Sequence, residues 1–393
     1  MNRATSILIF CVAVLLGLGM ITLYSSSMNM ELNRAAVGSD FLRSQMVWGV
    51  IGLAGCAVAA AVDYRRWKPM APWILGFSVL LLILVFVPHI GWAAKAGHGG
   101  GGAEGAHRWI GVPYFPMLPH FQPSELAKLA LILFLAAYAE RYQRQMETFQ
   151  RGFLIPAAVI GVILGLVFVE PDRGCAMLLA AVAGTVLLVA GARLRYLAPA
   201  GLAGVGGLAW SLLHDPMRHG RIFAWLHPEL TKEDAGYQPY QAMIAFGSGG
   251  WTGVGLGDSR QKLGFIQEHH TDFIFAIIGE ELGLVATLLV VMFFVALLFC
   301  GIYIARRACD TFGRLLACGI TFMISIQAFI NMGVAASLLP CKGMPLPFIS
   351  YGGSNLLLML VSVGLLLSIS RSAAEPAEAK DNPFDASPKL SDE

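Results

Sequence analysis

Residues 282–304 read LGLVATLLVVMFFVALLFCGIYI, a run of 23 residues without a charged side chain. The hydrocarbon core of a bilayer is about 30 Å thick, and a helix needs roughly 20 apolar residues to cross it. This run is therefore long enough for one crossing. Nine further apolar segments follow the same pattern. Together they predict an all-α integral membrane protein with about ten transmembrane helices, near residues 6–24, 45–62, 71–88, 124–139, 153–169, 174–191, 196–213, 272–304, 315–338 and 346–369.

The composition supports this class and argues against others. Hydrophobic residues make up 56% of the 393 residues and charged residues only 13%, and the mean hydropathy is +0.66. Ordinary soluble domains contain about 25% charged residues. The net charge is +2 and the Lys and Arg residues are scattered, so we expect no nucleic-acid partner. The seven cysteines show no CxxC spacing, which argues against a disulfide framework and a zinc site.

Basic residues indicate the orientation, because cytoplasmic loops of membrane proteins carry an excess of Lys and Arg. Such residues occupy every second short loop, and these loops and both termini are predicted to be cytoplasmic. Two long segments then face the exterior, 88–123 and 214–271, the larger one between helices seven and eight. We predict one polytopic membrane domain over residues 1–370 and a disordered cytoplasmic tail over 371–393.

The first exterior segment contains the glycine-rich stretch GHGGGGAEG, residues 97–105. A phosphate-binding loop would follow a strand and continue into GK[ST], and neither feature is present here. A flexible linker is therefore the favoured interpretation.

Ionisable residues at the apolar segments all fall at predicted exterior ends: Glu125, Lys128, Glu170, Asp172, Asp272, Glu280 and Glu281. Charged groups at such positions are costly and often functional. Glu125 and Lys128 are three residues apart and share a helix face, so they form either a local ion pair or part of a charged vestibule. Neutral polar residues such as Gln327 and Asn331 are predicted in the middle of the membrane.

The helix over residues 272–304 is longer than one crossing requires. Its 33 residues would measure about 50 Å at roughly 1.5 Å per residue, so Asp272 is expected at or above the outer headgroups. Glu280 and Glu281 are expected in an exterior extension of this helix, where they shape the vestibule or pair with neighbouring helices. Thr271 or Asp272 can serve as a helix N-cap, and this role is compatible with catalysis because the helix N-terminus favours an ionised carboxylate.

The exterior loop before this helix carries groups that suit a phosphorylated, sugar-containing ligand. Arg218 and Arg221 can hold a diphosphate through bidentate contacts. The flat faces of Trp109, Trp225, Tyr237, Tyr240 and Trp251 can stack on sugar rings or anchor the chain at the membrane interface, and anchoring is the commoner role.

Five motifs, in this order, resemble one family: FQPSELAKLALILF at 121–134, VEPDRGCAMLL at 169–179, DAGYQPYQAMIAFGSGGWTGVGLGDSRQKLGFIQEHH at 234–270, EHHTDFIFAIIGEELG at 268–283, and LLPCKGMPLPFISYGGSNLL at 338–357. They are similar to the SEDS family, which comprises the FtsW, RodA and SpoVE proteins. The stretch GVGLGDSRQKL is closest to the division branch of that family, FtsW and SpoVE.

The resemblance implies a ten-helix inner-membrane peptidoglycan glycosyltransferase that polymerises lipid II during septal cell-wall synthesis. It also implies a class B penicillin-binding transpeptidase and other division proteins as partners. The family's essential aspartate corresponds to Asp272, its QPSELAK pair to Glu125 and Lys128, and the tryptophan of its RWI segment to Trp109. Arg173 departs from the usual PDLGTA motif, so no role is carried over to that loop.

The implied mechanism is inverting glycosyl transfer. Asp272 would take the proton of the attacking sugar hydroxyl. Lys128, Arg218, Arg221 or a divalent cation such as Mg²⁺ or Mn²⁺ would stabilise the departing diphosphate, and His270 would orient Asp272 or the substrate. Two alternatives remain open: a lipid II flippase, and a non-enzymatic scaffold of the division machinery.

Overall fold

The computed structural model describes residues 3–33, 37–87, 91–93, 107–110, 121–170, 172–214, 216–227, 229–231, 236–266 and 270–373. The glycine-rich stretch 97–105 and all but the first three residues of the predicted tail lie outside these ranges, so both predictions about them stay untested.

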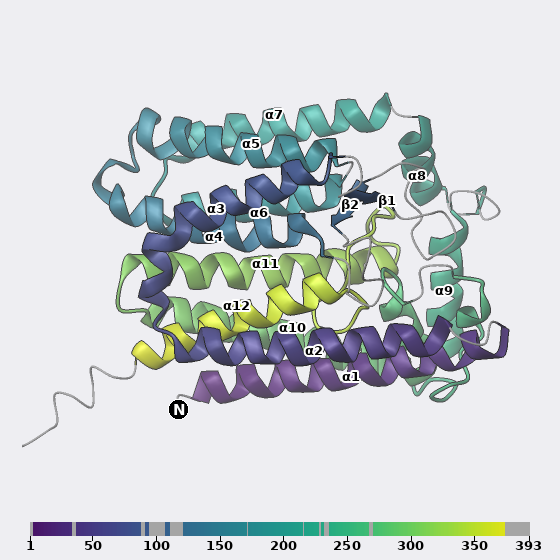
Figure 1. The fold of residues 1–393 in the computed structure, drawn as a ribbon. Helices are drawn as coiled ribbons and strands as arrows, with labels where there is room; N and C mark the ends of the chain where they lie inside the picture. The colour runs from purple at the N-terminus through teal and green to yellow at the C-terminus, as the bar shows by residue number, and fades with distance from the viewer. Residues whose placement is uncertain are drawn as a thin grey trace, which may run out of the picture.

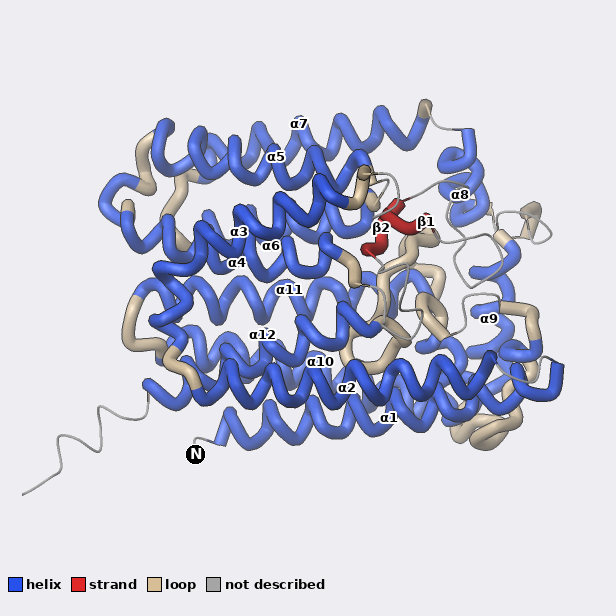
Figure 2. The backbone as a smooth tube through the Cα atoms, in the orientation of Figure 1, coloured by secondary structure: helices blue, strands red, loops and turns tan. Residues whose placement is uncertain are grey.

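Helices make up nearly all of the described structure (Figures 1 and 2). The long helices occupy the ranges predicted from the apolar segments: α1 Arg3–Asn33, α2 Val37–Ala61, α3 Trp67–Leu84, α4 Pro123–Arg141, α5 Ile155–Val169, α6 Arg173–Val189, α7 Leu194–Leu213, α10 Ile274–Arg307, α11 Thr311–Ala335 and α12 Gly353–Ser372. They lie side by side along one direction (Figure 1). The all-α membrane class is confirmed.

Seven helices in the described part of the chain are long and apolar enough to cross a membrane. The apolar helix α6 has only 17 residues, and α4 contains the buried ionisable residues Glu125 and Lys128. The chain is therefore a multi-pass membrane protein, and the number of ten crossings stays a prediction.

One end of the bundle holds the long connections, and we call it the polar end. There a two-stranded antiparallel ribbon, β1 Gly91–Ala93 and β2 His107–Ile110, pairs Trp92 with Trp109 (red in Figure 2). The connection from α7 to α10 contains two short helices, α8 Pro216–Leu226 and α9 Tyr237–Gly249, which hydropathy did not predict.

The core is formed around α11 and α12, which are mostly buried by the other helices. Close helix contact depends on small residues, as is usual in membranes. A Cβ atom on Gly364 of α12 would lie 2.4 Å from the carbonyl oxygen of Cys56 on α2. Side chains larger than hydrogen at this position would force α2 and α12 apart.

Helix α10 is broken at Gly283, where φ is 75° and ψ is −173°. The backbone groups that the break releases bind the segment after α9: Val254 N donates to the Glu280 carbonyl at 2.9 Å, Gly255 N to the Glu281 carbonyl at 3.1 Å, and Leu284 N to the Gly250 carbonyl at 2.9 Å. Unsatisfied backbone groups cost several kcal/mol in a membrane, so this segment makes the break possible.

The break corrects the predicted geometry of this helix. The helix is not one straight rod of about 50 Å, and the position of Asp272 relative to the headgroups stays a prediction. The part after the break, residues 284–307, has 24 residues and measures about 36 Å, which is enough to span by itself. The part before the break is a short separate helix, and its Glu280 and Glu281 are buried inside the protein.

The start of the last helix also differs from the prediction. Residues 346–352 were expected to be helical, but α12 begins at Gly353 and residues 336–352 form an irregular loop. Ser350 Oγ holds this loop by accepting from Leu346 N at 2.8 Å and donating to the Thr271 carbonyl at 2.6 Å. We call residues 336–352 the α11–α12 loop.

Candidate functional site

The first component of the site is a buried ion pair on the first turns of α4. Lys128 Nζ lies 2.7 Å from Glu125 Oε2, and the two residues are only 4% and 6% exposed. Lys128 Nζ also donates to Gln327 Oε1 of α11 at 2.8 Å. The local ion pair is therefore present, and the charged vestibule, the other alternative, stays a prediction.

One face of α11 joins this pair to the segment that carries Asp272. Gln327 Nε2 donates to the Pro345 carbonyl at 2.9 Å and to Asn355 Oδ1 at 3.1 Å. Asn331, one turn further along, donates to the Met344 carbonyl at 2.6 Å and to the Asp272 carbonyl at 3.0 Å. Gln327 and Asn331 therefore connect the buried ion pair with the α11–α12 loop and with the backbone of Asp272, and their predicted depth in the membrane stays untested.

Asp272 lies between this face and the α11–α12 loop. It precedes α10, whose N-cap is Phe273, and its side chain is partly exposed. A Cβ atom on Gly343 would lie 2.6 Å from Asp272 Oδ2. The carboxylate thus lies directly against the backbone of the loop.

His270 precedes Asp272 by two residues in the sequence. It is buried, and its ring packs among aromatic rings. Its ring centroid lies 5.0 Å from that of Phe41 and 6.0 Å from that of Tyr351, and its carbonyl accepts from Tyr351 N at 3.0 Å. These contacts fix the backbone that carries Asp272, which supports an orienting role.

Glu170 and Asp172 lie at the adjoining ends of α5 and α6. Asp172 does not end α5 as expected; it caps α6, accepting from Cys175 N at 3.1 Å, and it also accepts from Gln122 Nε2 at 3.3 Å. Glu170 is fully buried, and its carboxylate oxygens have no hydrogen-bond partner among the described residues. Burial, reinforced by the negative charge of Asp172, raises the pKa of Glu170 to about 8.

Trp109 is held at the same end through the β-ribbon. Its neighbour Arg108 donates from Nε to the Glu170 carbonyl at 3.1 Å, and Ile110 bridges to Phe121 just before α4. Trp109 is partly exposed, so its indole is available for stacking or anchoring.

Glu280 and Glu281 belong to a separate network that fastens α10 to its surroundings. Glu281 accepts from Ser25 of α1 and pairs with Lys262 at 2.8 Å, both charged side chains being fully buried. Glu280 accepts from the backbone of Arg260 and Gln261 and from Ser259. The predicted pairing with neighbouring elements is thus present for these two acids, and their place in an exterior extension stays a prediction.

Two further sets of expected ligands are less defined. Arg218 and Arg221 lie on α8, but their side chains are outside the described part of the structure. Among the described residues, no three His, Cys, Asp or Glu side chains cluster as metal ligands usually do, and Glu125 and Glu281 are already paired with lysines.

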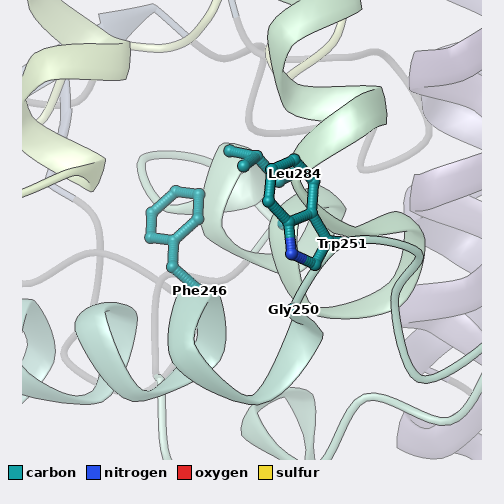
Figure 3. A pocket seen from close by; sticks show the side chains of 5 residues that line it. Phe246, Gly250, Trp251 and Leu284 are labelled. Carbon is teal, nitrogen blue, oxygen red and sulfur yellow. The ribbon is translucent and has the colours of Figure 1, made fainter.

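An apolar pocket of about 310 Å³ lies next to the break in α10. Figure 3 shows Phe246 of α9 on one side and Trp251 with Leu284 on the other, and Gly250 and Gly279 complete the lining. The sequence did not predict this pocket, because hydropathy does not distinguish a broken apolar helix from a continuous one.

These observations define a class: a multi-pass helical membrane protein with a charged, partly buried site at one end of its bundle. The chain matches the family described as "Cell cycle protein", which covers FtsW, RodA and SpoVE, over residues 6–375. It belongs to this family, the SEDS family.

Relatives of known name and structure are similar along nearly the whole chain. The probable peptidoglycan glycosyltransferase FtsW of Geobacter sp. (strain M18) is 40% identical over 93% of this chain and 96% of its own. Stage V sporulation protein E of Bacillus subtilis is 36% identical over the same shares, 93% and 96%.

Two solved structures share the fold at 27% identity. One is described as "Structural coordination of polymerization and crosslinking by a peptidoglycan synthase complex" and superposes with a TM-score of 0.73, covering 94% of this chain and 98% of that one. The other is the rod shape determining protein RodA of Thermus thermophilus, with a TM-score of 0.67 over 93% and 96%.

Proposed function

We propose that this protein is a peptidoglycan glycosyltransferase that polymerises lipid II. The observation that carries the proposal is the placement of a partly exposed Asp272, whose carboxylate lies against Gly343, on a polar network that reaches the buried Glu125–Lys128 pair through Asn331 and Gln327 of α11. Relatives named as such enzymes, with nearly full coverage, support the same activity. In the orientation that the family implies, the site lies at the outer face of the cytoplasmic membrane.

The chemistry is an inverting transfer between two lipid-linked disaccharides. The C4 hydroxyl of one GlcNAc attacks the anomeric carbon of the other MurNAc, and the bond from that carbon to the diphosphate breaks. Asp272 takes the hydroxyl proton as general base. The diphosphate leaves as an anion, so a second carboxylic acid is not required to protonate it, in contrast to most glycoside hydrolases.

Lys128 acts on this reaction mainly through its charge and through the residues that it binds. Its ammonium is bound to Glu125 and Gln327 and is almost completely buried. It therefore contributes to the electrostatic potential in the site, and it positions the α11–α12 loop through Gln327. Arg218 and Arg221 on α8 are further candidates for contact with the diphosphate.

We also propose that the enzyme works with a class B penicillin-binding transpeptidase and other proteins at the division septum. Support comes from the similar structure, which concerns polymerisation and crosslinking in a single complex, and from the FtsW and SpoVE relatives.

A reconstituted assay separates this function from the two alternatives. The purified protein, with and without its transpeptidase, is placed in liposomes containing fluorescent lipid II, and glycan length and transbilayer movement of the lipid are measured together. We expect glycan strands without accelerated movement. Movement without glycan would indicate a flippase, and neither activity in a correctly assembled complex would indicate a scaffold.

A further inference from the structure

Lys342 lies where the α11–α12 loop reaches the start of α6. The residue after it, Gly343, is the one on which the Asp272 carboxylate rests. On the other side, a Cβ atom on Gly174 would lie 3.3 Å from Lys342 Cε, and Lys342 Nζ is 2.6 Å from Met177 Sδ. The side chain therefore connects the Asp272 side of the site with the Asp172 side.

The Lys342 ammonium has a poor set of partners. A thioether sulfur is only a weak acceptor, and no carboxylate of the described residues lies within 4 Å of Nζ. Asp172 acts on the ammonium electrostatically, but its oxygens already accept from Cys175 and Gln122. The ammonium thus retains hydrogen-bonding capacity for a ligand.

The surroundings of Lys342 carry further positive charge. Arg173 is the first residue of α6, and the N-terminus of a helix has a partial positive charge of its own. Burial, together with Arg173, lowers the pKa of Lys342 to about 8 against the opposing effect of Asp172. A cation held in partly buried, positive surroundings is stabilised when an anion binds beside it.

We propose that Lys342 is a further substrate-binding residue, which contacts the diphosphate of the lipid-linked sugar between the start of α6 and Asp272. The inference rests on the proposed function and names a residue of the same site. In the described part of the chain, Lys128 is occupied by Glu125 and Gln327, whereas Lys342 is bound only to a thioether. When the sugar–phosphate bond breaks, its electron pair goes to the diphosphate oxygen. The Lys342 ammonium donates a hydrogen bond to that group and keeps its proton.

Binding of inorganic diphosphate tests Lys342 without requiring turnover. Its affinity for the full-length protein is measured by ligand-induced thermal stabilisation, with Lys342→Gln, Lys342→Arg and the control Lys68→Gln. Lys68 pairs with Glu140 at the opposite end of α4. We expect Lys342→Gln to weaken binding about 10-fold or more, as loss of a charge-assisted hydrogen bond does, and Lys342→Arg to stay within about 3-fold of wild type. Diphosphate binding at wild-type affinity by folded Lys342→Gln would overturn the proposal.

Polymerisation kinetics connect the residue to the lipid-linked substrate. With the transpeptidase present, Lys342→Gln should raise the apparent KM for lipid II about 10-fold while Lys68→Gln leaves it unchanged. If the wild type does not polymerise, the proposed function fails, and the diphosphate measurement still decides about Lys342. If the wild type polymerises and Lys342→Gln weakens only inorganic diphosphate binding, the assignment to the lipid headgroup is wrong.

Discussion

At the scale of the residue, Asp272 depends on a neighbour that has no side chain. Its carboxylate oxygen lies where a Cβ atom of residue 343 would be. Gly343 does not adopt a positive φ, so an alanine is compatible with the backbone there. The steric conflict would therefore fall on Asp272 itself.

Substituting Gly343 by Ala should displace the carboxylate without unfolding the protein. Because a shift of about 1 Å in a catalytic group can cost roughly 100-fold in rate, we expect lipid II polymerisation to fall at least 10-fold while the thermal unfolding temperature stays within a few degrees. The matched control is Gly184→Ala, whose Cβ would meet nothing within 4 Å. Wild-type rates in Gly343→Ala would mean that the position of Asp272 is not critical.

Glu170 makes stability depend on pH in a defined direction. Its pKa is about 8 in the folded protein against an ordinary value of 4.5. Between these values the folded state holds a proton that the unfolded state has released, so stability present below pH 4.5 is lost as the pH rises to about 8. Glu170→Gln should remove this dependence and raise the unfolding temperature at pH 8.5 above that of wild type. Parallel loss of stability in the two proteins between pH 5 and 8.5 would contradict the expectation.

At the scale of the element, the break in α10 decides where the first part of this helix and its acids lie. Gly283 adopts a backbone conformation that is essentially restricted to glycine. Moreover, its hypothetical Cβ would lie 2.4 Å from Gly253 N. The break is therefore a fixed feature of the fold, held by the segment after α9.

Gly283→Ala should destabilise the protein strongly. Backbone strain of this kind costs about 1–3 kcal/mol, and the contact with Gly253 adds to it, so a clear drop in unfolding temperature and in polymerisation is expected. Gly165→Ala in α5, where a Cβ meets nothing within 4 Å, should be neutral or slightly stabilising. Equal unfolding temperatures for the two variants would argue against a break at residue 283.

At the scale of the whole molecule, both described termini lie at the end away from the site. Thr5 Oγ1 of α1 and Ser370 Oγ of α12 are 2.6 Å apart, and Figure 1 shows the first turns of α1 and the last turns of α12 at the same end of the bundle. An even number of crossings would produce this arrangement.

Reporter fusions test the orientation of the molecule. A periplasm-dependent phosphatase inserted in the connection between α8 and α9, at residues 229–231, should be active, and the same enzyme fused after residue 393 should be inactive. A fluorescent protein that matures only in the cytoplasm should give the opposite pattern. Phosphatase activity at the C-terminus would contradict the assignment of the termini to the cytoplasm.

Much of the fold could be predicted because lipid requires long apolar helices, and those are visible in a sequence. The break at Gly283 could not, since apolar residues continue on both sides and its partners lie about 30 residues earlier. The α11–α12 loop was mistaken for helix because LPFIS is apolar, although it is held by Ser350. In the site, Gln327 and Asn331 were recognised as polar residues of an apolar segment, but their contacts with Pro345 and Met344 could not be predicted because these residues lie in that irregular loop.

The central claim is that Asp272 is the base of a lipid II polymerase, and glycan synthesis by the purified protein with its transpeptidase tests it most directly. Asp272→Asn preserves shape and removes the base, and Asp63→Asn at the opposite end of the bundle is the matched control, because Asp63 only caps a short helix. The account predicts glycan strands from wild type and Asp63→Asn, and none from folded Asp272→Asn. Polymerisation by Asp272→Asn at the wild-type rate would contradict it.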